Sequence, residues 1–549
     1  MSTVEPTSAP APTPEFAREG HAARYVTGTV DAFDRYGDRT ALVSADRDIG
    51  YRELLTATYR LARALRTQGV ERGSGVVCLV TNTPEALYLR FACHVLGARY
   101  VAVQLNALTE DLAHILVDAD PTVVVFDPRG TPPDQPVPLV AARAGVRRVL
   151  ALGPTAATTD LLALAAAQPA TPIAVAAEED DIAGICYTGG TTGTPKGVAC
   201  TFAALAAASE ASARTAAGLP LPDGLRFIAA TSIAYAVGDL AVQMLVLGIA
   251  VELHEVFDAG TFWAAVRRSG PVATFLYPPQ LYQLLDHPAA PTEPGGHLAL
   301  VVYGSSPVAP RRLRQAIERL GPIFLQGYAQ TEVTSVTILT PEDHLAAVID
   351  RPQLLASVGR PVPGCTVSIL DEQGRERAPG EVGEVCVRSA SVMTGYWRQP
   401  ELTAQVVRDG RLHTGDLGYL DDDGYLYLVG RLRDMIIVNG RNCHAAPVEA
   451  ALTGHPQVRQ AAVVGVPSEE TGEAIHAFVV RAPDRPAGPG NRAELVDAEH
   501  LRALVADQLG ALRAPAAVTF VDDIPLTAAG KPDKKALRAS LDATPVGAR

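Results

Sequence analysis

The chain has 549 residues, of which 48% are hydrophobic, and its formal net charge is −13 at pH 7. This length exceeds one ordinary hydrophobic core and predicts at least two domains, while the negative charge argues against nucleic acid as the main partner. The seven cysteines are widely spaced and include no C-x-x-C pair, so their pattern indicates neither a disulfide framework nor a zinc site.

The N-terminal end does not have the pattern of a signal peptide. Residues 1–20 are rich in proline, alanine and small polar residues and lack a basic segment followed by an apolar one, which predicts a disordered leader. The most apolar later window, residues 241–251, is shorter than the roughly 20 residues that cross a bilayer. We therefore expect a soluble, cytoplasmic protein without a membrane span.

The folded part is expected to begin near residue 25 and to alternate helices with strands. Apolar residues at helical spacing predict helices over residues 51–65, 84–96, 108–119, 202–217 and 240–247. Short β-rich runs predict strands over residues 76–81, 100–105, 122–126, 225–230 and 272–277. Such alternation favours parallel sheets with helices on their faces. The predicted fold class is α/β, with a large N-terminal domain of mixed α/β layers.

The pattern changes in the last third of the chain. Short strands over residues 366–387, with a turn at 371–374, predict an antiparallel β subdomain, and a second turn at 421–424 precedes a strand over 425–429. Helices and strands of a smaller α+β unit follow from residue 435, interrupted by a glycine- and proline-rich loop at 485–491. We expect an N-terminal domain over 21–430, a hinge over 431–434 and a mobile C-terminal domain over 435–549.

A run of glycines, hydroxyls and one lysine, residues 187–197, follows a short apolar segment. Glycines let backbone N–H groups converge on an anion, and threonine hydroxyls and an ammonium add further donors. This pattern predicts a loop that holds the phosphates of a nucleotide, although a solvated turn between strands is the alternative. The spacing differs from G-x-x-x-x-G-K-[ST], so no helix is expected to open there. The candidate phosphate-binding residues are Thr188, Gly189, Gly190, Thr191, Thr192, Gly193 and Lys196.

Four further motifs follow in order: Gln-Gly-Tyr-Ala-Gln-Thr-Glu at 326–332, Thr-Gly-Asp at 414–416, Gly-Arg-Leu-Arg-Asp at 430–434 and Pro-Leu-Thr-Ala-Ala-Gly-Lys at 525–531. Together with the glycine-rich loop, this set resembles the AMP-forming acyl-adenylating superfamily of acyl- and aryl-CoA ligases, amino-acid adenylation domains and luciferases. The resemblance covers residues 25–538. It implies an enzyme that uses ATP and Mg²⁺ to activate a carboxylic acid as an acyl-AMP with release of pyrophosphate.

The resemblance also assigns roles within the nucleotide site. Activation of a carboxylate by ATP depends on positioning and on electrostatic stabilisation. Thr331 is expected to place a hydroxyl near the α-phosphate and Glu332 to bind Mg²⁺ through a carboxylate oxygen; a solvated glutamate after a strand is the alternative. The turn at 304–306 is expected to let the backbone approach the adenine base closely. The remaining expected ATP-binding residues are Gly304, Ser305, Ser306, Gly327, Tyr328 (stacked on adenine), Ala329, Asp416 (on the ribose hydroxyls) and Arg431.

The C-terminal domain carries the expected catalytic lysine. Lys531 follows a glycine, and in the superfamily a lysine at this place reaches the carboxylate and the α-phosphate as charge develops on them. A solvated basic tail is the alternative because Lys534 and Lys535 are close by. By position Arg433 resembles the hinge residue about which the domain rotates after adenylation to present another face for thioester formation.

The expected acid pocket involves residues 232–239, Tyr277 and residues 303–306. Its candidate substrate-pocket residues are Tyr235, Ala236, Gly238, Asp239 and Tyr277. The aspartate that binds an amino-acid ammonium in adenylation domains is replaced by Ala234 or Tyr235, so an α-amino acid is not expected. The two tyrosines favour an aryl or aryl-alkenyl acid over a fatty acid, although the small residues leave room for an acyl tunnel.

The acceptor of the acyl group is less well indicated. After residue 437 the superfamily usually shows two glycines and later a proline, whereas this chain has Val-Asn-Gly-Arg-Asn-Cys-His-Ala-Ala-Pro at 438–447. CoA is the expected co-substrate. The alternatives are a carrier-protein thiol, which Gly440 to Asn442 suggests by its similarity to fatty acyl-AMP ligases, or an amine, including nitrite activation for diazotisation. A nucleotide-binding protein without turnover is a remote alternative, and His444 is expected to be structural.

Overall fold

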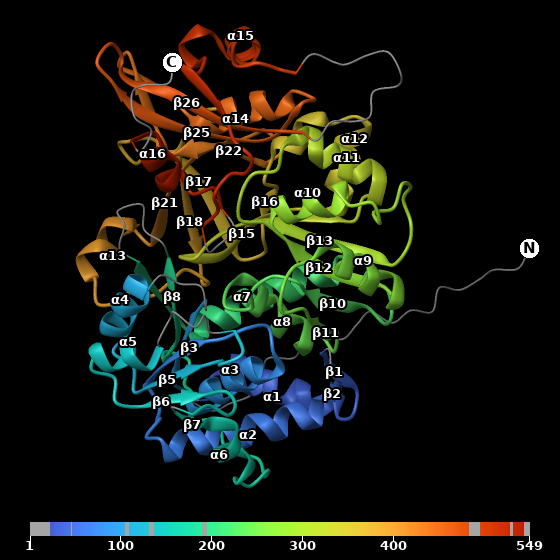
Figure 1. Cartoon of the computed structure of the whole chain (residues 1–549), viewed down its shortest axis with the longest axis vertical. Coiled ribbons are helices and arrows are strands. Elements are labelled where there is room, and N and C mark those ends of the chain that lie inside the picture. The colour runs from blue at the N-terminus through green and yellow to red at the C-terminus, as the bar shows by residue number, and fades with distance from the viewer. Residues whose placement is uncertain are drawn as a thin grey trace, which may run out of the picture.

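The computed structural model describes residues 22–44, 47–104, 109–130, 137–156, 158–188, 195–482, 495–527 and 531–542. The predicted leader and the predicted loop at 485–491 lie outside these residues. The described residues form four β-sheets, and the two largest belong to the N-terminal part of the chain (Figure 1).

The first large sheet has eight strands. Five neighbouring strands, β4, β3, β5, β6 and β7, pair in parallel, as the alternation of helices and strands predicted. The spatial order is β19 (Gly395–Tyr396), β9 (Lys196–Thr201), β8 (Ile182–Thr188), β4 (Arg99–Val103), β3 (Gly75–Leu79), β5 (Val123–Phe126), β6 (Val149–Ala151) and β7 (Thr159–Asp160).

The second large sheet has nine strands and a parallel centre. Its order is β16 (Arg360–Pro361), β15 (Val333–Leu339), β14 (Phe324–Gln330), β13 (Leu298–Gly304), β12 (Val272–Leu276), β10 (Arg226–Ala229), β11 (Ala250–Leu253), β1 (Thr40–Val43) and β2 (Asp48–Gly50). Antiparallel strands lie at both edges, because β15 reverses against β14 and β2 against β1.

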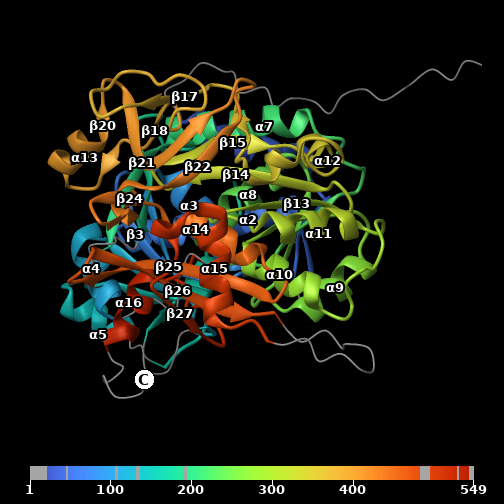
Figure 2. The ribbon, with the colours of Figure 1, turned by 90° about the horizontal axis from the view of Figure 1, so that it is seen from above.

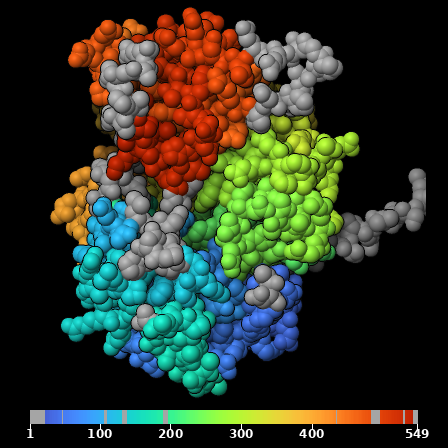
Figure 3. All heavy atoms as spheres, viewed as in Figure 1, coloured from blue at the N-terminus to red at the C-terminus, as the bar shows by residue number. Residues whose placement is uncertain are grey.

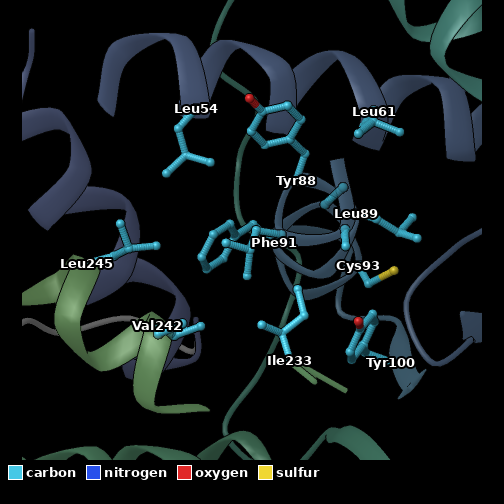
Figure 4. Packing of buried hydrophobic residues seen from close by; sticks show 14 of the residues in the cluster. Leu54, Leu61, Tyr88, Leu89, Phe91, Cys93, Tyr100, Ile233, Val242 and Leu245 are labelled. Atoms are coloured by element: carbon cyan, nitrogen blue, oxygen red, sulfur yellow. The ribbon is translucent and has the colours of Figure 1, made fainter. Parts of the chain in front are cut away.

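The two sheets share a helical layer. Successive side chains of a strand point to opposite faces: in β3, Val76 and Cys78 face the central core, whereas Val77 and Leu79 face another core. In β10, Phe227 faces the same central core from the second sheet. The helices that contribute to this core include α1 (Arg24–Tyr36), α2 (Tyr51–Thr67), α3 (Pro84–Leu96), α7 (Phe202–Ala217) and α8 (Ala236–Val246). Figure 4 shows Phe91 of α3 between Leu54 of α2 and Val242 of α8.

Further helices cover the outer faces. On the first sheet these are α4 (Thr109–Ala119) and α5 (Val137–Arg143), and on the second they are α9 (Ala259–Arg268), α10 (Pro278–Asp286), α11 (Pro310–Leu320) and α12 (Pro341–Ile349). The N-terminal domain is thus built of alternating helical and sheet layers, as the predicted fold class requires. The short helix α6 (Leu161–Ala166) contributes to the central core beside α2.

Two smaller sheets follow. The third contains β17 (Cys365–Leu370), β18 (Gly383–Ser389), β21 (Arg411–Leu420), β20 (Val407–Arg408) and β22 (Leu426–Arg431), and its antiparallel pairs confirm the predicted β subdomain. Helix α13 (Pro400–Val406) precedes β20. The fourth sheet contains β24 (Arg441–Cys443), β23 (Ile436–Val438), β26 (Gly472–Arg481), β25 (Val458–Ser468) and β27 (Ala517–Phe520).

The fourth sheet and its helices form the small C-terminal α+β domain. Its helices are α14 (Ala445–Gly454), α15 (Ala498–Leu509) and α16 (Lys534–Asp542). In Figure 1 this domain lies above the N-terminal layers, in Figure 2, which is seen from above, it lies in front of them, and Figure 3 shows its surface in orange and red. The change from the third to the fourth sheet falls between Arg431 and Ile436. The proposed domain boundaries and hinge remain predictions.

Most predicted elements are present with small changes of their ends. Helices α3 and α7 have the predicted bounds. Helix α8, however, begins at Ala236 and not at 240, so the predicted start is wrong. Gly238 lies in the first turn of this helix, and the position requires glycine because a Cβ there would collide with the Ile233 carbonyl oxygen and approach Arg90. Among the described helices, none is long and apolar enough to cross a bilayer.

A buried histidine connects α12 to the second sheet. His344 is completely buried, and its Nδ1 donates to the Thr340 carbonyl oxygen at 2.7 Å, since a carbonyl oxygen can only accept. Its Nε2 therefore accepts from the hydroxyl of Tyr303 on β13 at 2.8 Å. Burial lowers the pKa of His344 from 6.5 to about 4. The folded protein thus holds this imidazole neutral at pH values where the unfolded chain would protonate it.

This difference predicts a loss of stability in mild acid. Because the pKa is lower in the folded state, the stabilising contribution is complete above about pH 6.5 and is lost as the pH falls through about 4. The full loss corresponds to about 3 kcal/mol. His344→Gln should reduce the pH dependence of the urea midpoint of the N-terminal domain between pH 7 and pH 4.5. An identical pH dependence in both proteins would show that His344 does not titrate in this way.

Candidate active site

A buried carboxylate stands at the centre of the site. Asp416 lies in β21 opposite Arg431 of β22 and is 4% exposed. Its Oδ1 accepts from Arg431 Nε at 2.8 Å, and its Oδ2 accepts from the Tyr328 hydroxyl and from Gln330 Nε2, both at 2.6 Å. A buried charge is tolerated only when it is paired and hydrogen-bonded. The structure therefore brings together three residues predicted to bind the nucleotide, and it adds Gln330.

Tyr328 is closely packed. Burial, followed by the Asp416 charge, raises the pKa of its hydroxyl well above the usual value. The ring belongs to a hydrophobic cluster that includes Val198 and Val333. The core packing that is ordinary for a tyrosine is thus present, and the stacking of Tyr328 on adenine remains a prediction.

Next to Tyr328, two strands approach each other through glycine. Gly304 at the end of β13 pairs with Gly327 of β14, and a Cβ on Gly304 would lie 2.5 Å from the Gly327 carbonyl oxygen. Ser305 has a positive φ of 72°, which is uncommon outside glycine. Ser305 and Ala329 are exposed at these strand ends, and Ser306 is half-buried. The two strands thus approach closely at the place predicted for adenine, and the adenine site itself remains a prediction.

The predicted metal-binding carboxylate and the phosphate-binding lysine meet around one tyrosine. Thr331 and Glu332 form the turn between β14 and β15. The hydroxyl of Tyr396 on β19 donates to Glu332 Oε1 at 2.8 Å, and Lys196 Nζ lies 5.7 Å from the centroid of the Tyr396 ring. Tyr396 could not be predicted, because nothing in the local sequence around this residue indicates that β19 pairs with β9.

The glycine-rich segment connects two strands of a hairpin. Thr188 at the end of β8 pairs with Lys196 at the start of β9, so among the described residues a strand, and not a helix, follows the lysine, as predicted. Residues 189–194, which include the candidates Gly189, Gly190, Thr191, Thr192 and Gly193, lie outside the described residues. Helix α4 holds the two ends of the hairpin: His114 Nε2 donates to the Pro195 carbonyl oxygen at 3.0 Å, and the Tyr187 hydroxyl donates to Asp118 at 2.6 Å.

The predicted acid pocket is built around the start of α8. Tyr235 occupies the N-cap position of this helix, and Tyr277 occupies that of α10. Burial raises the pKa of both hydroxyls, that of Tyr277 to about 12, and the nearby Cys186 thiol adds to each shift. Two aromatic rings and the half-buried thiol of Cys186 therefore lie close together. Ala236 is exposed, whereas Gly238 is packed against the Ile233 carbonyl oxygen and leaves no room for an acyl tunnel there.

Asp239 has a partner that the sequence did not indicate. The guanidinium of Arg90 on α3 forms an ion pair with it. The Arg90 side chain is 8% exposed, whereas that of Asp239 is 43% exposed. Asp239 does not cap the helix, because the N-cap of α8 has no side-chain hydrogen bond. Asp239 thus presents an accessible carboxylate with a buried cation behind it.

The catalytic and hinge candidates lie in the C-terminal part. Lys531 closes a turn, since its backbone N–H donates to Thr527 Oγ1 at 3.2 Å and its carbonyl accepts from the Thr527 N–H at 2.7 Å. Arg433 lies in a short 3₁₀ turn, Leu432–Asp434, between the third and fourth sheets, and its side chain lies outside the described residues. The roles of both residues remain predictions.

The altered segment after the hinge forms a tight hairpin. Asn439 and Gly440 connect β23 to β24, and both have positive φ, 50° and 70°. Asn-Gly with two positive φ angles is typical of a two-residue type I′ turn. Arg441 and Asn442 follow and are exposed, whereas His444 lies at the N-terminus of α14 with its side chain against Gly430. These contacts favour the structural role expected for His444.

Comparison with known proteins places this geometry in a family. The protein-family model for the AMP-binding enzyme matches residues 30–397, and the family model for the AMP-binding enzyme C-terminal domain matches residues 447–531. The chain is 35% identical to a medium/long-chain-fatty-acid–CoA ligase of Mycobacterium tuberculosis, over 93% of this chain and 89% of that protein. It is 32% identical to a feruloyl-CoA synthase of Amycolatopsis, over 90% of this chain and 94% of that protein.

Solved structures of similar proteins support the same family. The amide bond synthetase McbA of Marinactinospora thermotolerans matches with a TM-score of 0.83 and 39% identity, covering 94% of this chain and 99% of that one. ATP-bound MatB of Rhodopseudomonas palustris matches with a TM-score of 0.82 and 28% identity, again covering 94% and 99%. With both domains matched over most of the chain, the chain belongs to the AMP-binding, adenylate-forming enzymes, as a member of the family of AMP-forming acid–thiol ligases.

Proposed function

We propose that this ligase adenylates an aryl or aryl-alkenyl acid with ATP and Mg²⁺ and transfers the acyl group to CoA. The carboxylate oxygen bonds to the α-phosphorus, and the bond to the β-phosphate oxygen breaks, so that pyrophosphate leaves. The thiol then replaces AMP at the acyl carbon. The observation that carries the adenylation step is the convergence of Lys196 and Glu332 at Tyr396, beside the buried network of Asp416.

The chain supplies suitable groups for each part of the nucleotide. The Glu332 carboxylate is a hard oxygen ligand of the kind that Mg²⁺ prefers, and Lys196 provides positive charge for the phosphates. A carboxylate can accept about four hydrogen bonds, and Asp416 already accepts three from the protein. Its Oδ1 retains one acceptor position, so we expect it to bind one ribose hydroxyl and not both.

The pocket residues support an aromatic acid. Tyr235 and Tyr277 lie near Cys186, and Phe275 packs edge-to-face on Tyr277 with ring centroids 5.3 Å apart. A flat ring can pack between such side chains with favourable offset or edge contacts. Similarity to the feruloyl-CoA synthase supports the same class, whereas similarity to the fatty-acid ligase keeps a longer chain as the competing substrate.

Amide formation is the second candidate. The 39% identity to an amide bond synthetase over nearly the whole chain favours it, and so does the altered hairpin at 438–443, because the superfamily uses this region to shape the second active site. In this case an amine nitrogen attacks the acyl carbon, AMP leaves, and the amine loses a proton.

The two candidates can be separated in one product assay. Wild-type protein is incubated with ATP, Mg²⁺ and a panel of aryl, aryl-alkenyl, fatty and amino acids, with nitrite as a further substrate. Each reaction receives CoA, a primary amine, a carrier protein or no acceptor, and products are identified by mass. An aryl-CoA thioester as the main product is expected. Amides without thioesters would establish the second candidate, and absence of AMP with every substrate would contradict both.

Tyr396→Phe tests the position of the metal-binding carboxylate. Phenylalanine keeps the ring beside Lys196 but removes the hydroxyl that holds Glu332. Loss of such an outer contact typically costs 10–100-fold in metal affinity, so the Mg²⁺ concentration for half-maximal adenylation should rise at least about 10-fold, with the KM for the acid unchanged. Tyr419→Phe is the matched control, since Tyr419 stacks on Tyr427 instead. Equal Mg²⁺ dependence in Tyr396→Phe and wild type would exclude this role.

Lys531→Ala tests the catalytic lysine. Its charge is needed where negative charge develops in the transition state, so adenylation should fall by about 100-fold or more, with little change in ATP affinity measured by calorimetry. Lys535→Ala, in the same basic segment, should retain nearly full activity. Unchanged adenylation in Lys531→Ala would remove this lysine from the mechanism.

A further inference from the structure

Three side chains with metal-binding atoms meet on one face of the third sheet. Glu384 and Cys386 lie two residues apart on β18, and His413 on β21 lies opposite Cys386. A register shift between Glu384 and Cys386 marks a bulge in the ladder, a feature that re-aims side chains. One carboxylate oxygen, the thiol sulfur and a ring nitrogen all lie within 4.8 Å of one another.

The contacts of His413 cannot all be satisfied at once. Its Nδ1 lies 2.7 Å from Glu384 Oε2, 2.8 Å from an Arg408 guanidinium nitrogen and 3.3 Å from Cys386 Sγ. A ring nitrogen carries either one proton or one lone pair. It must donate to pair with the carboxylate, but it must accept to pair with the guanidinium. One of these close contacts is therefore unfavourable in the metal-free protein.

The same geometry argues against a nucleophilic cysteine. In a thiol–imidazole–carboxylate relay, the thiol and the carboxylate contact different ring nitrogens. Here both contact Nδ1 of His413, and Cys386 is completely buried. A substrate could not reach this sulfur.

We propose that Glu384, Cys386 and His413 form a site for Zn²⁺ or a similar divalent transition metal, with Arg408 displaced and water as the fourth ligand. Oxygen, nitrogen and sulfur donors in this combination suit zinc, which prefers four tetrahedral ligands. The lone pairs of all three side chains can then point to one cation, and the short Nδ1–Oε2 distance lengthens to accommodate it. Deprotonation of the thiol supplies the thiolate and releases one proton.

The residues around the three ligands leave the proposed site accessible and hold the Glu384 side chain in place. The Arg408 side chain is 53% exposed and can move into solvent, which opens a path to the three ligands. Glu384 keeps its other oxygen on the Gly415 N–H at 3.1 Å, so its orientation is held from behind. Because Gly415 precedes Asp416, the metal would bind next to the nucleotide site but through residues that do not belong to it.

Cobalt substitution tests the proposal in the full-length, tag-free protein. Co²⁺ should produce visible d–d bands of a tetrahedral site together with a near-ultraviolet thiolate-to-cobalt band, and one equivalent of Zn²⁺ should abolish both. Cys386→Ser should lose the thiolate band, and His413→Gln should bind at least about 10-fold more weakly. Arg408→Met should bind more tightly, because the competing cation is removed.

The control variant replaces a different cysteine of the same sheet. Cys365→Ser on β17 should retain the wild-type spectrum, and thermal unfolding of each variant shows that it is folded. Absence of the thiolate band in wild-type protein overturns the proposal, as does its persistence in Cys386→Ser. Weaker binding in Arg408→Met would contradict the displacement of the guanidinium.

Discussion

The buried charge of Asp416 is the constraint on which the candidate active site depends. A carboxylate that is 4% exposed must be compensated by neighbouring donors, and here the donors come from β14 and β22. The network therefore fixes the second large sheet against the third. Because Arg431 ends β22 just before the short turn that leads to the C-terminal domain, the same charge also anchors the segment about which that domain is expected to rotate.

The site lies where three sheets meet. Lys196 comes from the first sheet, Glu332 follows a strand of the second, and Asp416 belongs to the third. Tyr396 connects two of them, since its backbone pairs with β9 and its hydroxyl holds Glu332. Such an arrangement suits a reaction that depends on positioning and electrostatics, because each charged group is held by a different rigid element.

Local sequence signals explain which elements could be predicted. Proline at the first position of α3 and Thr201 as the N-cap of α7 mark the starts of helices whose bounds were predicted correctly. The start of α8 was missed because glycine is needed at position 238 for close packing against the Ile233 carbonyl and Arg90 of α3, and no local pattern shows this. The motif residues that identify the family could be named from sequence, and the structure brings Tyr328, Asp416 and Arg431 together.

Partners from distant helices and strands could not be predicted. Packing or strand register that no local pattern determines brings together Arg90 and Asp239, Tyr396 and Glu332, and Cys386 and His413.

The role of Asp416 in adenylation is tested most directly by acid-dependent exchange of labelled pyrophosphate into ATP, measured for wild type and for Asp416→Asn. We predict exchange in wild type and a KM for ATP at least about 10-fold higher in the variant, since a charge-assisted hydrogen bond is lost. No exchange with any acid, or an unchanged KM in a folded variant, would contradict it.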